Sequence, residues 1–397
     1  MTTKQSFFRL AAPFAMAAIV VSACSGGGAT QSPSSSAAAP STGGGASAPA
    51  SAATGSEAAG GNMDKLIADA KAEGGLTTIA LPHSWCNYGE VITGFTAKYG
   101  IPINELNPDA GSGDEVEAIK ANKDNKGPQA PDVIDVGLSF GPQAKTDGLI
   151  APYKVSTWDD IPDTAKDADG SWYGDYYGVL AFETNKAVVP TPPADWKDLL
   201  DPSHKNQIAL SGDPRVSNQA IQTVYAAGLA NGGSLDDAQK GLDFFKQLND
   251  AGNLVPTIAK PGTIDQGATP ITIRWTYNAL QHKKDANGNP EIDVTVPASG
   301  RFAGVYVQAI SAFAPHPNAA KLWMEYLYSD EGQLLWLKGF CNPIRYEAMN
   351  AAGKIPADLA ATLPDTSGAV FPTLDQLNKA TDLITKNWDS VVGADVK

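Results

Sequence analysis

The segment Pro131-Asp132-Val133-Ile134-Asp135-Val136-Gly137 decides the fold class. Its apolar run ends in glycine, which predicts a buried strand. The preceding chain predicts helices over 63–73, 88–99 and 115–121 and strands over 76–81 and 101–106. This alternation favours an α/β fold with a mostly parallel sheet flanked by helices. Ligands of such sheets bind at the carboxyl ends of the strands.

A second α/β unit follows residues 171–181, a segment dense in aromatic side chains. The chain after it predicts helices over 196–200, 218–229, 235–249 and 317–328 and strands over 207–210, 270–279, 292–297 and 304–313. Alternation in the strand over 270–279 would place Ile271, Ile273, Trp275 and Tyr277 on one face. The chain is long enough for two domains of ordinary size.

The N-terminal residues predict export. Lys4 and Arg9 precede an apolar run over 10–21, and Val21-Ser22-Ala23-Cys24 resembles a lipobox. The run is shorter than the roughly 20 apolar residues that span a bilayer. We therefore expect residues 1–23 to be a lipoprotein signal peptide and Cys24 to carry lipid. An ordinary cleaved signal next to an unrelated cysteine is the alternative.

The segment after Cys24 predicts a flexible tether. Residues 25–61 are almost all Gly, Ser, Ala, Pro and Thr, with Glu57 as their one charged residue. Such a composition has little to bury and remains a flexible linker. We expect an exported lipoprotein held at the outer face of the cell membrane, or on its periplasmic side, with its folded body beginning near Asn62.

The net charge and the cysteine count limit the partners and the covalent bonds that this chain can have. The formal net charge is −14, and loss of Lys4 and Arg9 with the signal leaves −16, which argues against a nucleic-acid partner. With Cys24 lipidated, Cys86 and Cys341 remain, and an exported compartment permits a disulfide between them. Such a bridge would close a loop of roughly 250 residues and contribute about 4–5 kcal/mol by chain entropy. Two buried free thiols are the alternative.

Six segments, in a fixed order, resemble motifs of the extracellular solute-binding proteins of ABC importers. They are Leu81-Pro82-His83-Ser84-Trp85, the strand over 131–136, Tyr177-Gly178-Val179 through Asn185-Lys186, Trp196-Lys197-Asp198-Leu199-Leu200, residues 304–312, and Pro317-Asn318-Ala319-Ala320 through Asp330-Glu331-Gly332. The likeness extends from Asn62 to Trp388. It is to the type II group that includes spermidine, putrescine, iron, thiamine and phosphonate binders.

This resemblance implies a two-lobed, periplasmic-binding-protein-like type II fold with a hinge of two or more crossovers. The first lobe would comprise 62–180 and 308–345, and the second 181–307 and 346–397. The resemblance also implies a monomer without cofactor that captures a small solute between its lobes and delivers it to the transmembrane subunits of a permease. Cys86 and Cys341 would both lie in the first lobe, where a bridge would fix a ligand-facing loop.

Candidate ligand residues lie in the loops that the resemblance places at the cleft. A solute cleft needs aromatic faces, a few convergent polar groups and helix N-termini. The candidates are His83, Ser84, Trp85, Asp135, Ser139, Tyr176, Tyr177, Arg215, Ser217, Asn218, Trp275, Tyr277 and Tyr306. In sugar and polyamine binders of this family, the tryptophan at the position of Trp275 contacts the ligand. The structural alternatives are core packing for the aromatic residues, a helix cap for Ser217 and a surface ion pair for Arg215.

The ligand class follows from what these loops offer. Ferric binders place adjacent tyrosines where this chain has Trp275-Thr276-Tyr277, and polyamine binders place carboxylates where it has Asn278 and Val216-Ser217-Asn218. Asp135 and Glu183 remain available to an amine. A Ser/Asn-rich helix start beside Arg215 favours a phosphonate-like or phosphate-like group. We expect an anionic or zwitterionic organic solute; a polyamine receptor, or a surface sensor or adhesin that retains the fold, is the alternative.

One motif would suit an enzyme instead. Gly137-Leu138-Ser139-Phe140-Gly141 fits the Gly-x-Ser-x-Gly nucleophile elbow, with His282 and His316 downstream. Residues 142–148 lack the apolar helix that normally follows an elbow, and a Gly-rich ligand loop is the simpler interpretation. The histidines His83, His204, His282 and His316 show no metal-ligand spacing. We expect neither catalytic residues nor a bound metal.

Overall fold

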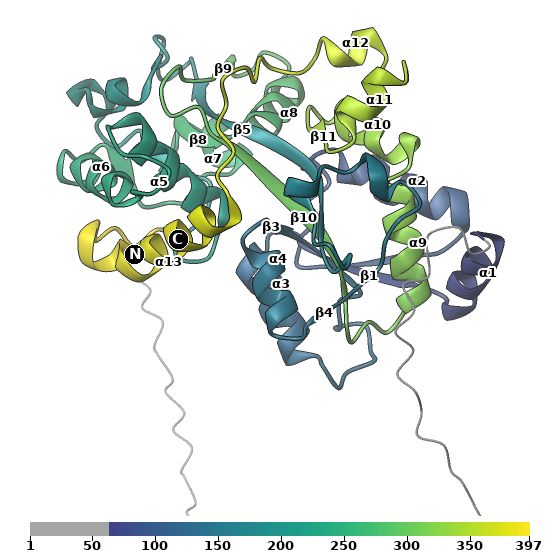
Figure 1. Ribbon diagram of the computed structural model, residues 1–397. Coiled ribbons are helices and arrows are strands. Elements are labelled where there is room, and N and C mark those ends of the chain that lie inside the picture. The colour runs from purple at the N-terminus through teal and green to yellow at the C-terminus, as the bar shows by residue number, and fades with distance from the viewer. Residues whose placement is uncertain (1–62) are drawn as a thin grey trace, which may run out of the picture. The chain divides into compact units, whose positions relative to one another are not determined.

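The computed structural model describes residues 63–397 (Figure 1). The predictions of a signal peptide, of a lipid on Cys24 and of a linker lie outside this range. Within it, no helix has the length and apolar character that a membrane span requires.

A mixed sheet forms the centre of the described body. Its hydrogen-bonded order is β3-β10-β5-β8-β6-β7, with β4 beside β10 and with β9 and β11 beside β5. These strands are β3 Val133–Gly137, β4 Ile150–Ala151, β5 Tyr173–Asn185, β6 Ile208–Leu210, β7 Leu254–Val255, β8 Ile271–Trp275, β9 Ile292–Thr295, β10 Ala303–Ser311 and β11 Asn342–Pro343. A parallel pair, β1 (Leu76–Ile79) and β2 (Ile103–Leu106), lies next to β3, since Asp132 N donates to Thr77 O at 2.8 Å.

The long strands β5 and β10 connect the two halves of the sheet. Strand β5 pairs with β10 through residues 173–179 and with β8 through residues 180–184. Pairing is antiparallel wherever β5 or β10 takes part and parallel at β1–β2, β6–β7 and β6–β8. The sheet is therefore mixed rather than mostly parallel, because two strands cross between its halves.

The helices fall into two groups, which we call the first and the second lobe (Figure 1). The first lobe holds β1–β4, β11 and the helices α1 Met63–Glu73, α2 Tyr88–Tyr99, α3 Ser112–Ala121, α4 Phe140–Thr146, α9 Pro317–Leu327 and α10 Asp330–Lys338. The second lobe holds β6–β9 and the helices α5 Asn218–Ala230, α6 Gln239–Asp250, α7 Pro261–Asp265, α8 Thr276–Ala286 and α13 Leu374–Val391. The remaining short elements are α11 Tyr346–Ala351, α12 Ala357–Ala360 and the 3₁₀ turns η1 Trp158–Asp160, η2 Asp163–Ala165, η3 Trp196–Leu200 and η4 Pro202–His204.

Helices from late in the chain pack on elements from much earlier. The Glu73 carboxylate at the end of α1 accepts hydrogen bonds from Asn318 N at 2.9 Å and Ala319 N at 2.8 Å, at the start of α9. In the second lobe, the ring of Trp388 on α13 lies 5.8 Å from that of Phe245 on α6. Each lobe is thus built from separate stretches of chain, as the resemblance implies, while the lobe boundaries in residues remain a prediction.

The predicted strand over 270–279 is wrong in its second half. Strand β8 ends at Trp275, whose backbone N–H donates to Gln219 Oε1 at 2.7 Å rather than continuing a ladder. Helix α8 then begins at Thr276 and ends with a left-handed Asn287. Tyr277 therefore lies on a helix and does not share the strand face of Trp275. The helix predicted over 235–249 begins only at Gln239, and α10 and α13 were not predicted.

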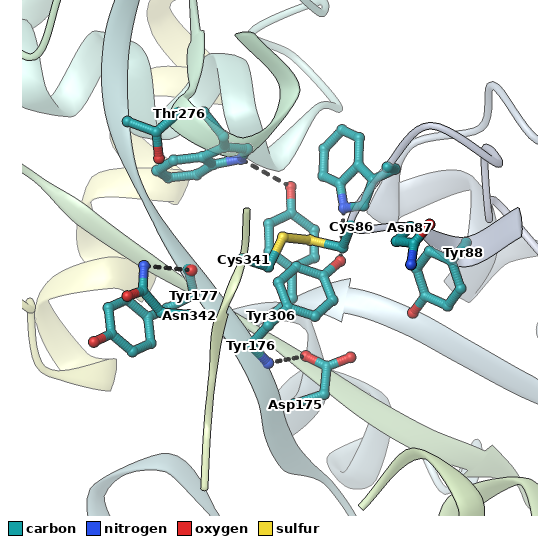
Figure 2. The surroundings of a disulfide bond; sticks show 12 residues. Cys86, Asn87, Tyr88, Asp175, Tyr176, Tyr177, Thr276, Tyr306, Cys341 and Asn342 are labelled. Atoms are coloured by element: carbon teal, nitrogen blue, oxygen red, sulfur yellow. Dashed lines mark hydrogen bonds between the residues drawn. A yellow bond between two sulfur atoms is a disulfide. The ribbon is translucent and has the colours of Figure 1, made fainter. Parts of the chain in front are cut away.

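A disulfide joins Cys86 to Cys341 inside the first lobe (Figure 2). Their Cα atoms lie 5.6 Å apart across a sequence separation of 255 residues, and both side chains are fully buried. Beside the bridge, Asn87 Nδ2 donates to Leu335 O at 3.2 Å. Asn342 follows Cys341 into β11, where it pairs with Tyr177. The bridge fixes the start of α2 and the end of α10 close to β5.

Candidate functional site

A cavity of about 570 Å³ lies between the two lobes. Its first-lobe wall is formed by the loop after β1, the start of α3 and Asp135 on β3, and its second-lobe wall by the loops after β6 and before α5 and α7 and by the β8–α8 junction. It therefore lies beside the carboxyl ends of several strands, where such sheets bind ligands. Of the predicted ligand residues, the structure brings six to this cavity: Ser84, Trp85, Asp135, Ser217, Asn218 and Tyr306.

A buried carboxylate, Asp135, forms the acidic part of the first-lobe wall. Its side chain is 5% exposed, and its Oδ2 accepts hydrogen bonds from Tyr88 Oη at 2.8 Å and Tyr176 Oη at 2.6 Å. Its backbone N–H donates to Glu115 Oε2 at 2.9 Å. Oδ1 has no hydrogen-bond partner among the described residues. Burial raises the pKa of Asp135 to about 7, against the opposing effect of the two tyrosine hydroxyls.

Two further carboxyl groups, Glu115 and Asp175, lie close to Asp135. Burial first, and then the charge of Asp135, raises the pKa of Glu115 and of Asp175 well above their ordinary values. Asp175 Oδ2 accepts a hydrogen bond from Gln308 Nε2 at 3.0 Å, which only partly opposes this effect. Asp135, with a pKa of about 7, therefore changes its charge near neutral pH.

Hydrogen-bond donors gather at the second-lobe side of the cavity. Asn218, at the start of α5, and Asn278, in the first turn of α8, are 3% and 5% exposed, and neither Nδ2 has a hydrogen-bond partner within residues 63–397. Arg274 Nε is also buried and unpartnered, although its Nη1 donates to Glu183 Oε2 at 3.1 Å. Helix N-termini and unpaired donors both favour a negatively charged group.

Two aromatic side chains complete the cavity wall. The rings of Trp85 and Tyr306 meet edge to face, with centroids 5.5 Å apart. Trp85 Nε1 donates to Tyr176 Oη at 2.7 Å, which connects the indole to the Asp135 cluster. Figure 2 shows Tyr176 and Tyr306 close to the disulfide that fixes this part of the first lobe. Trp85 and Tyr306 thus offer a rigid aromatic surface to a ligand.

The structure places Trp275 and Tyr277 in the hinge, where both are fully buried. A Cβ on Gly304 would lie 2.3 Å from Trp275 Cη2, and a Cβ on Gly178 would lie 2.4 Å from Tyr277 Cε1. These two glycines face each other in the β5–β10 pairing. The rings therefore pack on the backbone of the hinge strands, and neither side chain lines the cavity.

The other predicted ligand residues also lie away from the cavity. Tyr176 donates to Asp135 Oδ2 and is not among the residues that line the cavity. His83 is exposed and pairs with Glu105, with 2.7 Å between Nε2 and Oε2. Arg215 donates from Nε to Asp213 at 2.8 Å and from Nη2 to Asp395 at 3.2 Å. Tyr177 lines a second cavity of about 520 Å³.

The candidate nucleophile Ser139 has no base in reach. A short helix, α4, follows it from Phe140, but only Gly141 and Ala144 of this helix are buried, so the long apolar helix of an elbow is not formed there. In addition, His282 bonds to the carboxylates of Glu183 and Asp265, and His316 bonds to Asp132 with 2.8 Å between Nδ1 and Oδ2. Among the described residues, the serine–histidine pair of a hydrolase is therefore not formed.

Several lining residues could not be recognised from the sequence. Glu115 looks like any acidic residue in the first turn of a helix, and Lys260 and Lys397 look like ordinary surface lysines. In the structure, Glu115 is 1% exposed beneath the cavity, and Lys260 Nζ bonds to Asp109 Oδ2 of the other lobe at 2.7 Å. Only the folding of loops distant in sequence brings these side chains together.

The lobes touch at the rim of the cavity. A Cβ on Gly137 of β3 would lie 2.1 Å from Asn218 Cγ, so the absence of a side chain there admits the amide of the other lobe. A Cβ on Gly111 or Gly113, near the start of α3, would lie 3.6 Å from Val216 O. With the ion pair between Asp109 and Lys260, these contacts bring the two walls of the cavity together.

Comparisons with known proteins agree with this architecture. A family model described as bacterial extracellular solute-binding protein matches residues 129–377. An uncharacterized protein of Haemophilus influenzae is 30% identical over 262 residues, which cover 62% of this chain and 70% of that protein. A putative 2-aminoethylphosphonate-binding periplasmic protein of Salmonella typhimurium is 26% identical over 257 residues, covering 63% and 71%. The periplasmic binding protein AfuA from Actinobacillus pleuropneumoniae, solved with fructose-6-phosphate, superposes with a TM-score of 0.62 at 22% identity, covering 80% of this chain and 98% of that one.

Proposed function

The chain belongs to the bacterial extracellular solute-binding protein family, and from that premise we propose that its cavity captures an anionic or zwitterionic organic solute of the phosphonate or phosphate type. As a member of this family it is a non-enzymatic, exported receptor that delivers a small solute to the permease subunits of an ABC importer. The solute class and the residues that hold the solute are our proposal.

The unpartnered donors on the second-lobe wall are the observation on which the ligand class rests. Asn218, Asn278 and Arg274 line one cavity, and Asn218 Nδ2, Asn278 Nδ2 and Arg274 Nε have no hydrogen-bond partner in the part of the chain that the structure describes. A buried donor without a partner costs about 1–3 kcal/mol, and an oxyanion would relieve that cost at all three. The similarity to a putative aminoethylphosphonate-binding protein supports the same class.

We assign ligand contact to the lining residues Ser84, Trp85, Asp135, Ser217, Asn218 and Tyr306, together with Arg274 and Asn278. The lobes, with predicted boundaries 62–180 plus 308–345 and 181–307 plus 346–397, would close over the solute by bending at β5 and β10. In this scheme Tyr176, Trp275 and Tyr277 support the wall and the hinge from behind.

A screen of candidate solutes tests the ligand class. The purified body is melted with and without polyamines, sugar phosphates, amino acids and phosphonates, among them 2-aminoethylphosphonate. A ligand at about 100 times its Kd stabilises the folded state by about 2.7 kcal/mol, so a true solute raises the Tm measurably. We expect phosphonates or phosphates to raise it. A rise only with spermidine or putrescine would instead favour the polyamine receptor.

The anchor is a separate part of the proposal. We propose that the signal is removed before Cys24 and that a lipid on this cysteine tethers a monomeric receptor to the membrane. Changing Cys24→Ala should release the protein from the membrane fraction of expressing cells. Continued membrane association of the variant would contradict the lipid anchor and leave the ligand proposal unaffected.

A further inference from the structure

We propose that Asp135 binds a primary ammonium group of the solute, so that the receptor selects molecules that carry both an amine and an anionic group. This inference rests on the proposed function, because it adds a second recognition point to the same cavity. The Asp135 carboxylate lies on the first-lobe wall, and the unpartnered donors of Asn218, Arg274 and Asn278 lie on the second-lobe wall.

The hydrogen bonds of Asp135 leave one oxygen for a ligand. Tyr88 and Tyr176 both donate to Oδ2, and no described group donates to Oδ1, although the residue is 95% buried and lines the cavity. A carboxylate oxygen that is buried without a donor costs free energy, and a partner is normally supplied where one is available. An ammonium group in the cavity would supply both the donor and the opposite charge.

Comparison with Glu183 shows what an occupied carboxylate looks like in this protein. Glu183 is fully buried, and both of its oxygens are engaged, one by Arg274 Nη1 and the other by His282 Nδ1. Asp135 has no arginine, lysine or histidine partner among the described ion pairs. Its nearest charged or titratable neighbours are Tyr88 on α2, Glu115 on α3, and Asp175 and Tyr176 on β5.

The surroundings of Asp135 favour an ammonium group over a metal ion. The described residues contain no group of three or more His, Cys, Asp or Glu side chains arranged to hold a metal. Asp135, whose Oδ1 has no partner among the described residues, instead lines the cavity together with Trp85 and Tyr306, and aromatic faces attract cations. Burial raises the pKa of Asp135, and a bound cation would restore its charge at neutral pH.

A solute with two charged ends would connect the lobes. Its amine would meet the first lobe at Asp135, and its anionic group would meet the second lobe at Arg274 and Asn278. A solute without the amine would engage only the second lobe. Affinity should therefore depend on the presence of both groups in one molecule, because only then does closing the hinge satisfy both walls.

Matched pairs of ligands that differ only in the amine test the proposal. The pairs are 2-aminoethylphosphonate with ethylphosphonate, taurine with ethanesulfonate, and β-alanine with propionate, each titrated calorimetrically at pH 8. For the pair whose phosphonate, sulfonate or carboxylate group the cavity binds, we expect the amine-bearing member to bind at least about tenfold more tightly than its partner. Asp135→Asn should reduce this preference to less than about threefold.

Asp135→Asn is close to isosteric, and its amide oxygen can still accept from Tyr88 and Tyr176, so the variant should fold. The control, Asp169→Asn, removes the same charge from an exposed first-lobe position where Asp169 pairs with Lys145 at 3.0 Å. It should keep the full preference for the amine. Circular dichroism and thermal melting test whether both variants are folded. If Asp135→Asn does not fold, the matched ligand pairs measured on the wild type test the ammonium site by themselves.

The outcomes separate the two proposals. Equal affinity of the wild type for both members of a bound pair would overturn the ammonium site and leave the anion receptor in place. A preference for the amine that survives in Asp135→Asn would also overturn it. If no member of any pair binds, the proposed solute class fails and the ammonium site fails with it.

Discussion

The pKa of Asp135 is subject to two opposing effects. Two tyrosine hydroxyls hold one of its oxygens and favour the charged form, whereas burial raises its pKa to about 7. Burial and the charge of Asp135 also raise the pKa values of Glu115 and Asp175 well above their ordinary range. The charge of Asp135 therefore changes within the physiological range of pH.

Selectivity for an amine should depend on pH through this residue. Above pH 8 Asp135 is charged, and the ratio of affinities between aminoethylphosphonate and ethylphosphonate should be constant. As the pH falls through about 7, Asp135 gains a proton in the empty protein, and the ratio should fall by up to about tenfold per pH unit. Titration calorimetry from pH 5 to 8.5 measures it, and the same ratio measured in Asp135→Asn accounts for the different protonation of the two phosphonates. A ratio independent of pH would assign the amine to another group.

At the scale of single residues, the sequence predicted part of the cavity. Ser84, Trp85 and Asp135 follow or belong to strands whose ends could be recognised, so their loops could be placed. Trp275 was expected at the ligand by family likeness and Tyr277 through the predicted strand alternation, and the structure packs them on Gly304 and Gly178. The packing of these rings on glycines that are distant in sequence could not be predicted, because the residues next to Trp275 and Tyr277 do not indicate it.

At the scale of elements, the hinge depends on a pair of glycines. Gly178 on β5 and Gly304 on β10 lie opposite each other, and each admits an aromatic ring. Strand β10 was predicted over 304–313, whereas the segment of β5 was recognised only as dense in aromatic side chains. The junction of β8 with α8 could not be predicted from the local sequence. There Trp275 N donates to Oε1 of Gln219, a residue 56 positions away in the chain.

Adding a methyl group at the hinge should destabilise the protein. In Gly304→Ala the new Cβ would lie 2.3 Å from both Gln222 Oε1 and Trp275 Cη2, which are buried and cannot move freely. We expect a loss of about 1–3 kcal/mol of unfolding free energy in urea denaturation. Gly262→Ala in α7 is the control, since nothing lies within 4 Å of its Cβ. Equal stability of the two variants would contradict the packing.

Closure of the lobes should depend on Gly137. In Gly137→Ala the Cβ would lie 2.1 Å from Asn218 Cγ, which belongs to the other lobe, so the clash arises only when the lobes approach. We expect at least about tenfold weaker solute binding with little change in the Tm of the empty protein. Gly113→Ala places its Cβ 3.6 Å from Val216 O and should bind almost normally. A large loss of Tm in Gly137→Ala would show that the contact is structural.

At the scale of the whole molecule, the disulfide holds together parts of the first lobe that are far apart in sequence. Cys86 and Cys341 are separated by 255 residues, and both are fully buried. Two cysteines left over from the predicted lipobox sufficed to propose the pair. What the sequence could not supply is the neighbourhood, in which the bridge lies beside the strand β5 that reaches both lobes.

Removing the bridge should lower stability without abolishing solute binding. The double change Cys86→Ser and Cys341→Ser should cost about 2–5 kcal/mol, mainly because the unfolded chain regains entropy. Differential scanning calorimetry measures the loss, and mass spectrometry of unreduced peptides should detect the Cys86–Cys341 link. Two alkylatable thiols in the native, exported protein would contradict the bridge.

The packing of late helices on early strands has a consequence for biosynthesis. Strand β10 lies between β3 and β5, and α9 packs on the end of α1, so the first lobe has no complete core until residues beyond 327 are available. A chain that crosses a membrane from its N-terminus onwards would expose β1 and β3 for most of its passage. The disulfide of Cys86 likewise could not form until Cys341 had crossed the membrane. The architecture therefore favours export of an unfolded chain, followed by folding and oxidation only after nearly all of it has emerged.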